Sequence, residues 1–422
     1  MPLSIVEHQS FHQFLSIVDN KYSPVSRRTI TSKIDSLVGE RQIKLKNELA
    51  KADNVSVTVD IWSDRRMRGF LGVTGHWINI EDDSLQLKSQ LLACNRFRGS
   101  HTGERICEEF EQICEEYQMK KKVDHIICDN AANMKKAFST CFPGQEDEDD
   151  DLNDFNIWNN LTVEEQERFE NVLSAKSQTR LQCFAHTLQL TIGDGLKDTK
   201  IISAALSKAS RLSSLLHTST TFKDKFEMEF GQRGIPASVT TRWNSTLRQL
   251  KSVLNCDQLK LSAVLEDAGH KETVFTAREW SQIRELVDVL QPFGEATDLT
   301  QGEQIVTISA VVPCILSLNH HLENQKERVH YMGGLIRSLQ ESLLRRFRGI
   351  FVHVRMADDQ SDGATLPFSD PLYLKAALLD PSFGTMWLAH DVLAPENVKE
   401  DVSVMIKSML FFSVLIQFKC QT

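Results

Sequence analysis

Two aspartates, Asp60 and Asp129, each close an apolar, β-branched run of the sequence, VSVTVD and VDHIICD. An ionised carboxylate is costly to bury without a partner, so such a residue is either paired by the fold or placed to hold a ligand. Two carboxylates at one sheet edge suit Mg²⁺ or Mn²⁺, which take hard oxygen ligands. The alternative is a turn or N-cap role, because Asp129 stands directly before Asn130 and a helical pattern.

The elements that would position these aspartates are predicted from the hydrophobic period. Strands are predicted over residues 55–62, 69–79 and 84–94, and the short turns between them favour antiparallel pairing. The period then changes to that of an amphipathic helix over residues 101–117. A fourth strand over 123–129 follows this helix, and a strand reached through a helix is normally parallel to its neighbour in the sheet. If it lies beside the first strand, the two carboxylates converge.

The rest of the chain divides by composition and period. Residues 180–184 are a fifth predicted strand, and from there to about residue 350 nearly every segment has a helical pattern. The strand and helix order is that of the ribonuclease-H-like fold, with a helical block as an insertion. The predicted regions are a helical N-terminal region 1–50, a core 51–194 with an acidic loop 145–156, a helical insertion domain 195–390 and an atypical, truncated tail 391–422.

Composition narrows the functional classes. The net charge of −9 argues against non-specific nucleic-acid binding, although basic clusters such as Arg65-Arg66-Met67-Arg68 can hold phosphate. The nine cysteines include no CxxC pair, which favours reduced thiols inside the cell. No apolar run approaches the length of a membrane span, and the N-terminus lacks signal-peptide features. We therefore expect a soluble intracellular protein without membrane partners.

Five short stretches form an ordered set along the chain. They are TVDIWSD, HIICDNAANM, CFAHTLQL, TTRWNST and AALLDPSF. This set resembles motifs of the hAT superfamily of DNA transposases, particularly its domesticated relatives of the BED zinc-finger type. Several motifs in a fixed order are more specific than any one of them. The resemblance covers about residues 1 to 390 and implies an α/β fold, a ribonuclease-H-like mixed sheet interrupted by a large all-α insertion domain.

The resemblance implies a role for each matching residue of the sheet region. Asp60 and Asp129 match two of three acidic ligands for catalytic Mg²⁺ or Mn²⁺, and Trp62 matches an aromatic residue beside the active site that contacts DNA. Cys183 and His186 match a Cys-x-x-His pair near that site. Two ligands at this spacing do not make a zinc site, so no structural zinc is expected. The alternative role of the pair is packing at a strand-to-helix junction.

In the helical block, Arg242 and Trp243 match a motif in which the Trp stacks on a base extruded from DNA and the Arg neutralises a phosphate. Stacking of a base on an aromatic side chain contributes about 1–3 kcal/mol. The alternative is that Trp243 is a core aromatic residue.

The sequence departs from the family pattern in two places. No stretch resembles the motif that carries the third acidic ligand, a Glu, and no CxxC of a BED finger precedes residue 60. Glu295 and Glu303 are the nearest substitutes for that acid. We expect a catalytically inactive nuclear protein that binds DNA or regulates transcription, with a homodimer in a full-length form. The alternatives are a metal-dependent DNA transposase domain and an inert partial product.

Overall fold

The structure is a computed structural model. It describes residues 3–64, 66, 68–81, 84–97, 103–128, 179–197, 200–238, 243–302, 306–358, 366–389 and 399–405. Asp129, Arg242 and Glu303 lie outside the described residues, as does the predicted acidic loop 145–156. Of the predicted tail 391–422, only residues 399–405 are described, and they are helical.

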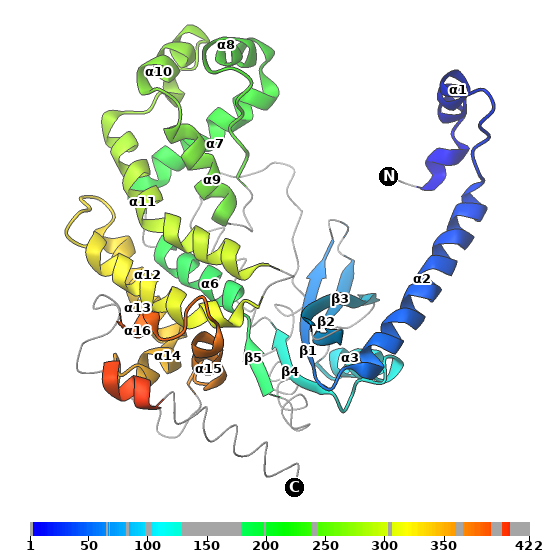
Figure 1. The fold of residues 1–422 in the computed structure, drawn as a ribbon. Coiled ribbons are helices and arrows are strands. Elements are labelled where there is room, and N and C mark those ends of the chain that lie inside the picture. Colours follow the sequence, from blue (N-terminus) through cyan, green and yellow to red (C-terminus); the bar gives the residue numbers. More distant parts are fainter. Residues whose placement is uncertain are drawn as a thin grey trace.

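Five strands form one mixed sheet in the order β3-β2-β1-β4-β5 (Figure 1). The strands are β1 (Val55–Ser63), β2 (Gly69–Glu81), β3 (Ser84–Phe97), β4 (Val123–Cys128) and β5 (Thr179–Gln182). Strands β1 to β3 are antiparallel neighbours, whereas β4 is parallel to β1 and β5 is parallel to β4. The predicted mixed sheet and the pairing of the first and fourth strands are confirmed.

The two faces of β1 differ because side chains alternate along a strand. Val55, Val57, Val59 and Ile61 are buried, and they share one hydrophobic core with residues of two helices, α2 (Arg27–Lys51) and α3 (Gly103–Glu116). The other face carries partly or fully exposed residues. They are Ser56, Thr58, Asp60 and Trp62. This alternation explains how β1 accommodates an Asp, since its carboxylate stands on the exposed face.

Three helices precede the sheet, where the sequence predicted a helical region. They are η1 (Leu3–Glu7), α1 (Gln9–Val18) and α2. Ser26 caps the N-terminus of α2 by accepting a hydrogen bond from the backbone N–H of Thr29. At the other end, the Lys122 ammonium donates to three carbonyl groups, those of residues 49, 50 and 52. A cation at a helix C-terminus also complements the helix dipole, so Lys122 fixes α2 to the sheet.

A block of helices follows β5 and has its own hydrophobic core. Its longer helices are α6 (Phe184–Lys197), α7 (Ser203–Thr218), α8 (Thr220–Phe230), α9 (Trp243–Leu254), α10 (Gln258–Asp267), α11 (Ala277–Thr300), α12 (Val311–Gln325) and α13 (Gly333–Arg346). The shorter elements are η3 (Lys200–Ile202), η4 (Lys271–Thr273), η5 (Ile308–Ala310), α14 (Arg348–His353), α15 (Leu372–Leu379) and α16 (Met386–Ala389). The predicted boundary between residues 194 and 195 falls inside α6, which packs with the helical block from its first turn.

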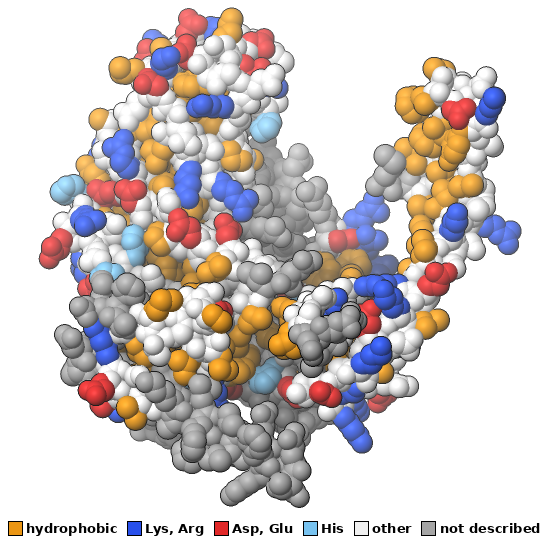
Figure 2. All heavy atoms as spheres, in the orientation of Figure 1, with side chains coloured by type: hydrophobic (Ala, Val, Ile, Leu, Met, Phe, Trp, Pro, Cys, Tyr) orange, Lys and Arg blue, Asp and Glu red, His pale blue; other side chains and the backbone are white. Residues whose placement is uncertain are grey.

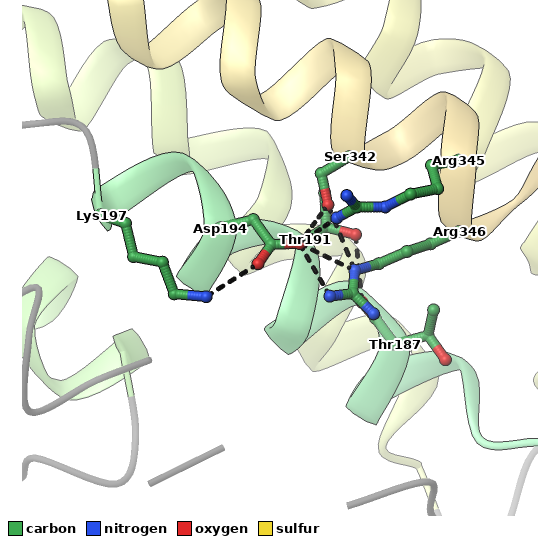
Figure 3. A network of polar contacts seen from close by, with 7 residues as sticks. All are labelled: Thr187, Thr191, Asp194, Lys197, Ser342, Arg345 and Arg346. Carbon is green, nitrogen blue, oxygen red and sulfur yellow. Dashed lines mark hydrogen bonds and ion pairs between the residues drawn. The ribbon is translucent and has the colours of Figure 1, made fainter. Parts of the chain in front are cut away.

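A polar network centred on Asp194 joins α6 to α13 (Figure 3). One carboxylate oxygen of Asp194 accepts hydrogen bonds from Ser342, Arg345 and Arg346, at 2.7 Å from the nearest donor atom of each. The other oxygen accepts from Lys197 at 3.1 Å. Burial would raise the pKa of Asp194, but the hydrogen bonds from Ser342 and Arg346 outweigh it and hold the pKa below its usual range.

None of the helices within the described ranges is long and apolar enough to cross a membrane.

Candidate nucleic-acid interface

The carboxyl ends of the parallel strands β1, β4 and β5 lie at one edge of the sheet. Val59 in β1 pairs with Cys128 in β4, and Cys128 pairs with Gln182 in β5. Asp60 therefore follows the last described pairing of β1 with β4. Asp129 lies outside the described residues. The predicted approach of the Asp60 and Asp129 carboxylates therefore stays a prediction.

Trp62 lies near the end of β1, on the exposed face of the sheet. Its indole stacks on the ring of Phe70 in β2, with ring centroids 5.8 Å apart and an angle of 18° between the planes. The indole also lies over Gly72, where an added Cβ would be 2.7 Å from a Trp62 ring carbon. Trp62 is nevertheless 38% exposed. The absence of a side chain at Gly72 lets the indole lie against the sheet while part of its surface stays open to solvent.

Two arginines flank this aromatic pair. The Arg68 guanidinium lies 5.9 Å from the centre of the Phe70 ring, and Arg96 in β3 is the cross-strand partner of Phe70. Arg96 is exposed. We call the group formed by Trp62, Phe70, Arg68 and Arg96 the Trp62 surface. Aromatic faces beside guanidinium groups are the combination that holds single-stranded nucleic acid, because bases stack on the rings and phosphates pair with the cations.

Asp64 is the acidic residue nearest to Asp60 along the chain, and its carboxylate makes its contacts within the turn between β1 and β2. Its carboxylate accepts hydrogen bonds from the backbone N–H groups of Arg66 and Arg68 and forms an ion pair with the Arg68 guanidinium. The Arg68 side chain is the main reason that the pKa of Asp64 falls to about 2. This pairing also holds Arg68 in place above Phe70.

Mg²⁺ or Mn²⁺ needs several oxygen ligands, and the described residues supply one candidate at this edge, Asp60. Within the described ranges, no group of three or more His, Cys, Asp or Glu side chains is arranged to hold a metal ion. Glu295, a predicted substitute for the third acid, lies exposed on α11 and accepts a hydrogen bond from Gln291 at 2.9 Å. A complete ligand set would therefore draw on residues outside the described ranges, including Asp129.

Cys183 and His186 lie at the junction between β5 and α6. The backbone N–H of Cys183 donates to the carbonyl of Cys128 at 3.3 Å, and the Cys183 carbonyl accepts from Thr187. His186 is buried in the first turn of α6. The pair thus stands at a strand-to-helix junction beside the carboxyl edge of the sheet, and its predicted role near an active site stays a prediction.

The structure differs from the DNA-stacking role predicted for Trp243. This residue begins α9 and is only 3% exposed, within the core of the helical block. Neither face of its indole is open to an extruded base, so its observed position is that of a core aromatic residue. Arg242, its predicted companion, lies outside the described residues. Of the two predicted tryptophans, only Trp62 has ring surface available for stacking.

Sequence reasoning did not identify Phe70 or Arg96, and it noted Arg68 only as part of a basic cluster. Their proximity to Trp62 depends on the strand register, which pairs Trp62 with Phe70 and Phe70 with Arg96. The position of the turn between β1 and β2 could have predicted the first of these pairs. A hairpin that is symmetric about residue 66 places residue 62 opposite residue 70.

Two family models match this chain. Residues 58–143 match the ZBED1 RNase-like domain, and residues 181–289 match the ZBED1 RNase-like helical domain. The first match contains Asp60 and the Trp62–Phe70 pair, and the second contains α6 to α10 and most of α11. The order of a sheet domain followed by a helical domain agrees with the architecture described above.

Similar proteins come from plants, fungi and animals. A putative AC transposase of Zea mays is 26% identical over 72% of this chain and 36% of its own length. A putative transcriptional regulator, tpeD, of Talaromyces stipitatus is 23% identical over 78% of this chain and 39% of its own length. Zinc finger BED domain-containing protein 4 of Homo sapiens is 22% identical over 95% of this chain and 31% of its own length. The chain thus spans well under half of these relatives.

Proposed function

Since this chain is a hAT-derived relative of the BED-type zinc-finger proteins, we propose that it is a nuclear DNA-binding protein that holds an unpaired stretch of DNA on its sheet and does not itself cut DNA. The names of its relatives give two classes of activity, transposase and transcriptional regulator. Both classes act on DNA in the nucleus, and binding is the step that they share.

The observation that carries this proposal is the Trp62 surface. Trp62 is held in one orientation by Phe70 and Gly72, so little conformational freedom is lost when a base stacks on it. Arg96 provides positive charge beside the rings in a protein whose net charge is −9, whereas the charge of Arg68 is balanced by its ion pair with Asp64. This charge therefore acts locally, and it favours a partner that presents a base and a phosphate together.

An unpaired base fits this surface better than a paired one. A stacking face must be free on the base, whereas bases inside a duplex are already stacked on their neighbours. The Trp62 surface lies on a sheet face and offers no helix or two-stranded ribbon of the kind that enters a major groove. We expect a frayed end, a hairpin tip or a single-stranded flank to bind more tightly than a blunt duplex.

The proposal that the chain does not cut DNA rests on the acids near the edge. Bound Mg²⁺ or Mn²⁺ would activate the attacking oxygen and stabilise the leaving one, and that requires a complete ligand set. Asp60 lies on the exposed face of β1, and the Asp64 carboxylate is ion-paired with Arg68. The alternative function, a metal-dependent DNA transposase domain, is favoured by the position of Asp60 at the carboxyl ends of parallel strands.

Fluorescence anisotropy with a labelled DNA hairpin that carries a short single-stranded flank tests the binding proposal. Trp62→Ala removes the stacking face, so we expect its Kd to rise about 5- to 150-fold, in line with a stacking energy of about 1–3 kcal/mol. Tyr22→Ala is the matched control, because it removes an exposed aromatic ring far along the chain from the sheet. Equal Kd values for the wild type and Trp62→Ala would contradict the proposal.

The same DNA, incubated with Mg²⁺ and separately with Mn²⁺, tests the absence of cleavage. We expect no metal-dependent product from either the wild type or Asp60→Asn. Cutting by the wild type that disappears in Asp60→Asn would replace this proposal with the transposase alternative, and it would assign a metal-binding role to Asp60.

A further inference from the structure

Asp60 lies beside the indole on which a base would stack. It shares the exposed face of β1 with Trp62, two residues and about 7 Å further along the strand. Gly72 in β2 is the cross-strand partner of Asp60, and the indole leans back over this glycine. Directly opposite residues of a sheet have Cβ positions about 5 Å apart. The side chain of Asp60 therefore borders the ring of Trp62.

Arg96 lies on the other side of the aromatic pair. Phe70 is the partner of Arg96 in β3, whereas Asp60 belongs to β1. Two strand spacings, about 10 Å, therefore separate the strand of the carboxylate from the strand of the guanidinium. The Trp62 surface thus has an acidic border and a basic border, with the rings between them.

We propose that Asp60 makes the Trp62 surface selective for an unpaired guanine, whose Watson–Crick edge the carboxylate binds while the base stacks on the indole. This inference rests on the proposed DNA binding and adds to it the identity of the base. Asp60 is then a specificity-determining residue, and it acts through hydrogen bonds without a metal ion.

Guanine is the base whose Watson–Crick edge fits a carboxylate. Its N1–H and N2–H₂ groups are adjacent donors that point the same way, and they match the two oxygens of a carboxylate. Adenine and cytosine present one amino group next to a ring nitrogen that accepts, and thymine presents one N–H between two carbonyl groups. Each of these three bases would turn an acceptor toward the negatively charged oxygens, so guanine is preferred.

The Asp60 carboxylate has enough acceptor capacity for this contact. Its two oxygens together offer about four lone-pair positions. A hydrogen bond that Asp60 makes within the protein therefore leaves positions for the two donors of a guanine.

The charges at the two borders also orient the nucleotide. Asp60 repels a phosphate and Arg96 attracts it, so the sugar–phosphate backbone lies toward β3 and the base edge toward β1. Acidic and basic side chains are interspersed over the described part of the molecular face in Figure 2. The charges that border the rings, rather than a field of one sign over the whole protein, therefore decide the selection.

Stacking favours a purine on the same surface. Trp62 is 38% exposed and forms an extended aromatic pair with Phe70. A purine has two fused rings and covers more of an indole than a pyrimidine does, and stacking strength is a source of base preference on such surfaces. Stacking thus separates purines from pyrimidines, and the carboxylate separates guanine from adenine.

Fluorescence anisotropy with four labelled hairpin DNAs tests the inference. Their single-stranded flanks are thymine runs that differ at one position, which carries G, A, C or T, and every titration contains EDTA. We expect the wild type to bind the G flank about tenfold more tightly than the A flank, as for one bidentate contact to a base. Inosine in place of G removes the N2 amino group and should raise the Kd to that of the A flank.

Asp60→Asn presents one acceptor and one donor, so we expect it to bind the G and A flanks with equal Kd. Asp124→Asn is the matched control, because it makes the same change at an exposed aspartate near the amino end of β4. It should keep the preference for G. A preference for G that persists in Asp60→Asn would overturn the role of Asp60.

The wild type and Trp62→Ala together separate this inference from the proposed function. Equal Kd values of the wild type for all four flanks, each raised by Trp62→Ala, would overturn the selectivity for guanine and leave the DNA binding standing. Kd values that Trp62→Ala does not change would overturn both.

Discussion

Trp62 and Trp243 are two tryptophans that the sequence assigns to DNA contact by the same kind of reasoning, and the structure separates them. Trp62 lies on the exposed face of the sheet, where it stacks on Phe70 and keeps part of its surface exposed to solvent. Trp243 lies in the core of the helical block, where its ring is also close to Gly294. A motif identifies a residue type. Whether the side chain of that residue is exposed depends on the strand or helix in which it lies.

The strand and the helix that contain these residues explain why Trp62 is exposed and Trp243 is buried. Strand β1 alternates, so every second side chain faces away from the core whatever its chemistry. Helix α9 is amphipathic, and Trp243 falls on the same side as its buried residues. The buried residues on that side are Thr246, Leu247, Leu250 and Val253, and Gln249 is buried as well. The helical period itself thus indicates that Trp243 faces the core, and this signal outweighs the motif.

Truncation of the two tryptophans should give the largest contrast in stability. Trp243→Ala leaves a cavity in the helical core and should lower the free energy of unfolding by about 3–5 kcal/mol. Trp62→Ala removes an exposed ring and one aromatic contact, so the loss should be about 0.5–1.5 kcal/mol. Urea unfolding followed by far-UV circular dichroism measures both values. Equal losses in the free energy of unfolding would contradict the difference between the two sites, because Trp62 would then be a core residue as well.

Asp194→Asn should have the next largest effect, confined to the helical block. The lost charge-assisted hydrogen bonds from Ser342 and the two arginines should cost about 2 kcal/mol at pH 7. Because the pKa of Asp194 is lower in the folded protein than in the unfolded chain, its contribution is present above about pH 4 and is lost as the pH falls below that value.

The stability difference between wild type and Asp194→Asn should therefore shrink as the pH is lowered from 5 to 2, in thermal melts recorded at each pH. Glu295→Gln is the control, since it changes an exposed carboxylate of the same block. A difference that stays constant with pH would show that Asp194 is not held ionised by its partners.

Gly72→Ala should have the smallest effect on stability and a selective effect on the sheet surface. The added methyl group would stand 2.7 Å from the Trp62 ring, so the indole must move off the sheet. We expect a loss of about 1 kcal/mol, at the low end for an added methyl group because the Trp62 side chain can move, together with a changed tryptophan emission spectrum and DNA binding that is several-fold weaker. DNA binding equal to that of the wild type would show that the orientation of Trp62 does not matter.

Much of the sheet follows from the sequence. The predicted strands at 55–62 and 84–94 correspond to Val55–Ser63 and Ser84–Phe97, and the parallel pairing of β4 with β1 is confirmed because a helix crossover leaves few other arrangements. The amphipathic helix at 101–117 corresponds to Gly103–Glu116. The local hydrophobic period and the lengths of the connections were enough to predict these elements.

The remaining features depend on contacts between segments that are distant in sequence. The Asp194 network joins residues about 150 positions apart, and no local pattern pairs them. The Trp62 surface needs the register of three strands, which hydrophobic alternation alone does not set for each side chain. Helix α1 was predicted to form, but its position beyond α2, where it contacts η1, is not set by any local pattern.

The most direct test of the account is base stacking at Trp62, measured by the fluorescence of 2-aminopurine placed in the single-stranded flank of the hairpin DNA. Stacking on an indole quenches this base, so we expect quenching on binding to the wild type and to Trp243→Phe, which keeps an aromatic ring in the helical core. With Trp62→Ala at saturating protein, the fluorescence should stay high. Quenching that persists in Trp62→Ala and disappears in Trp243→Phe would contradict the account, because the base would then be held by the helical block.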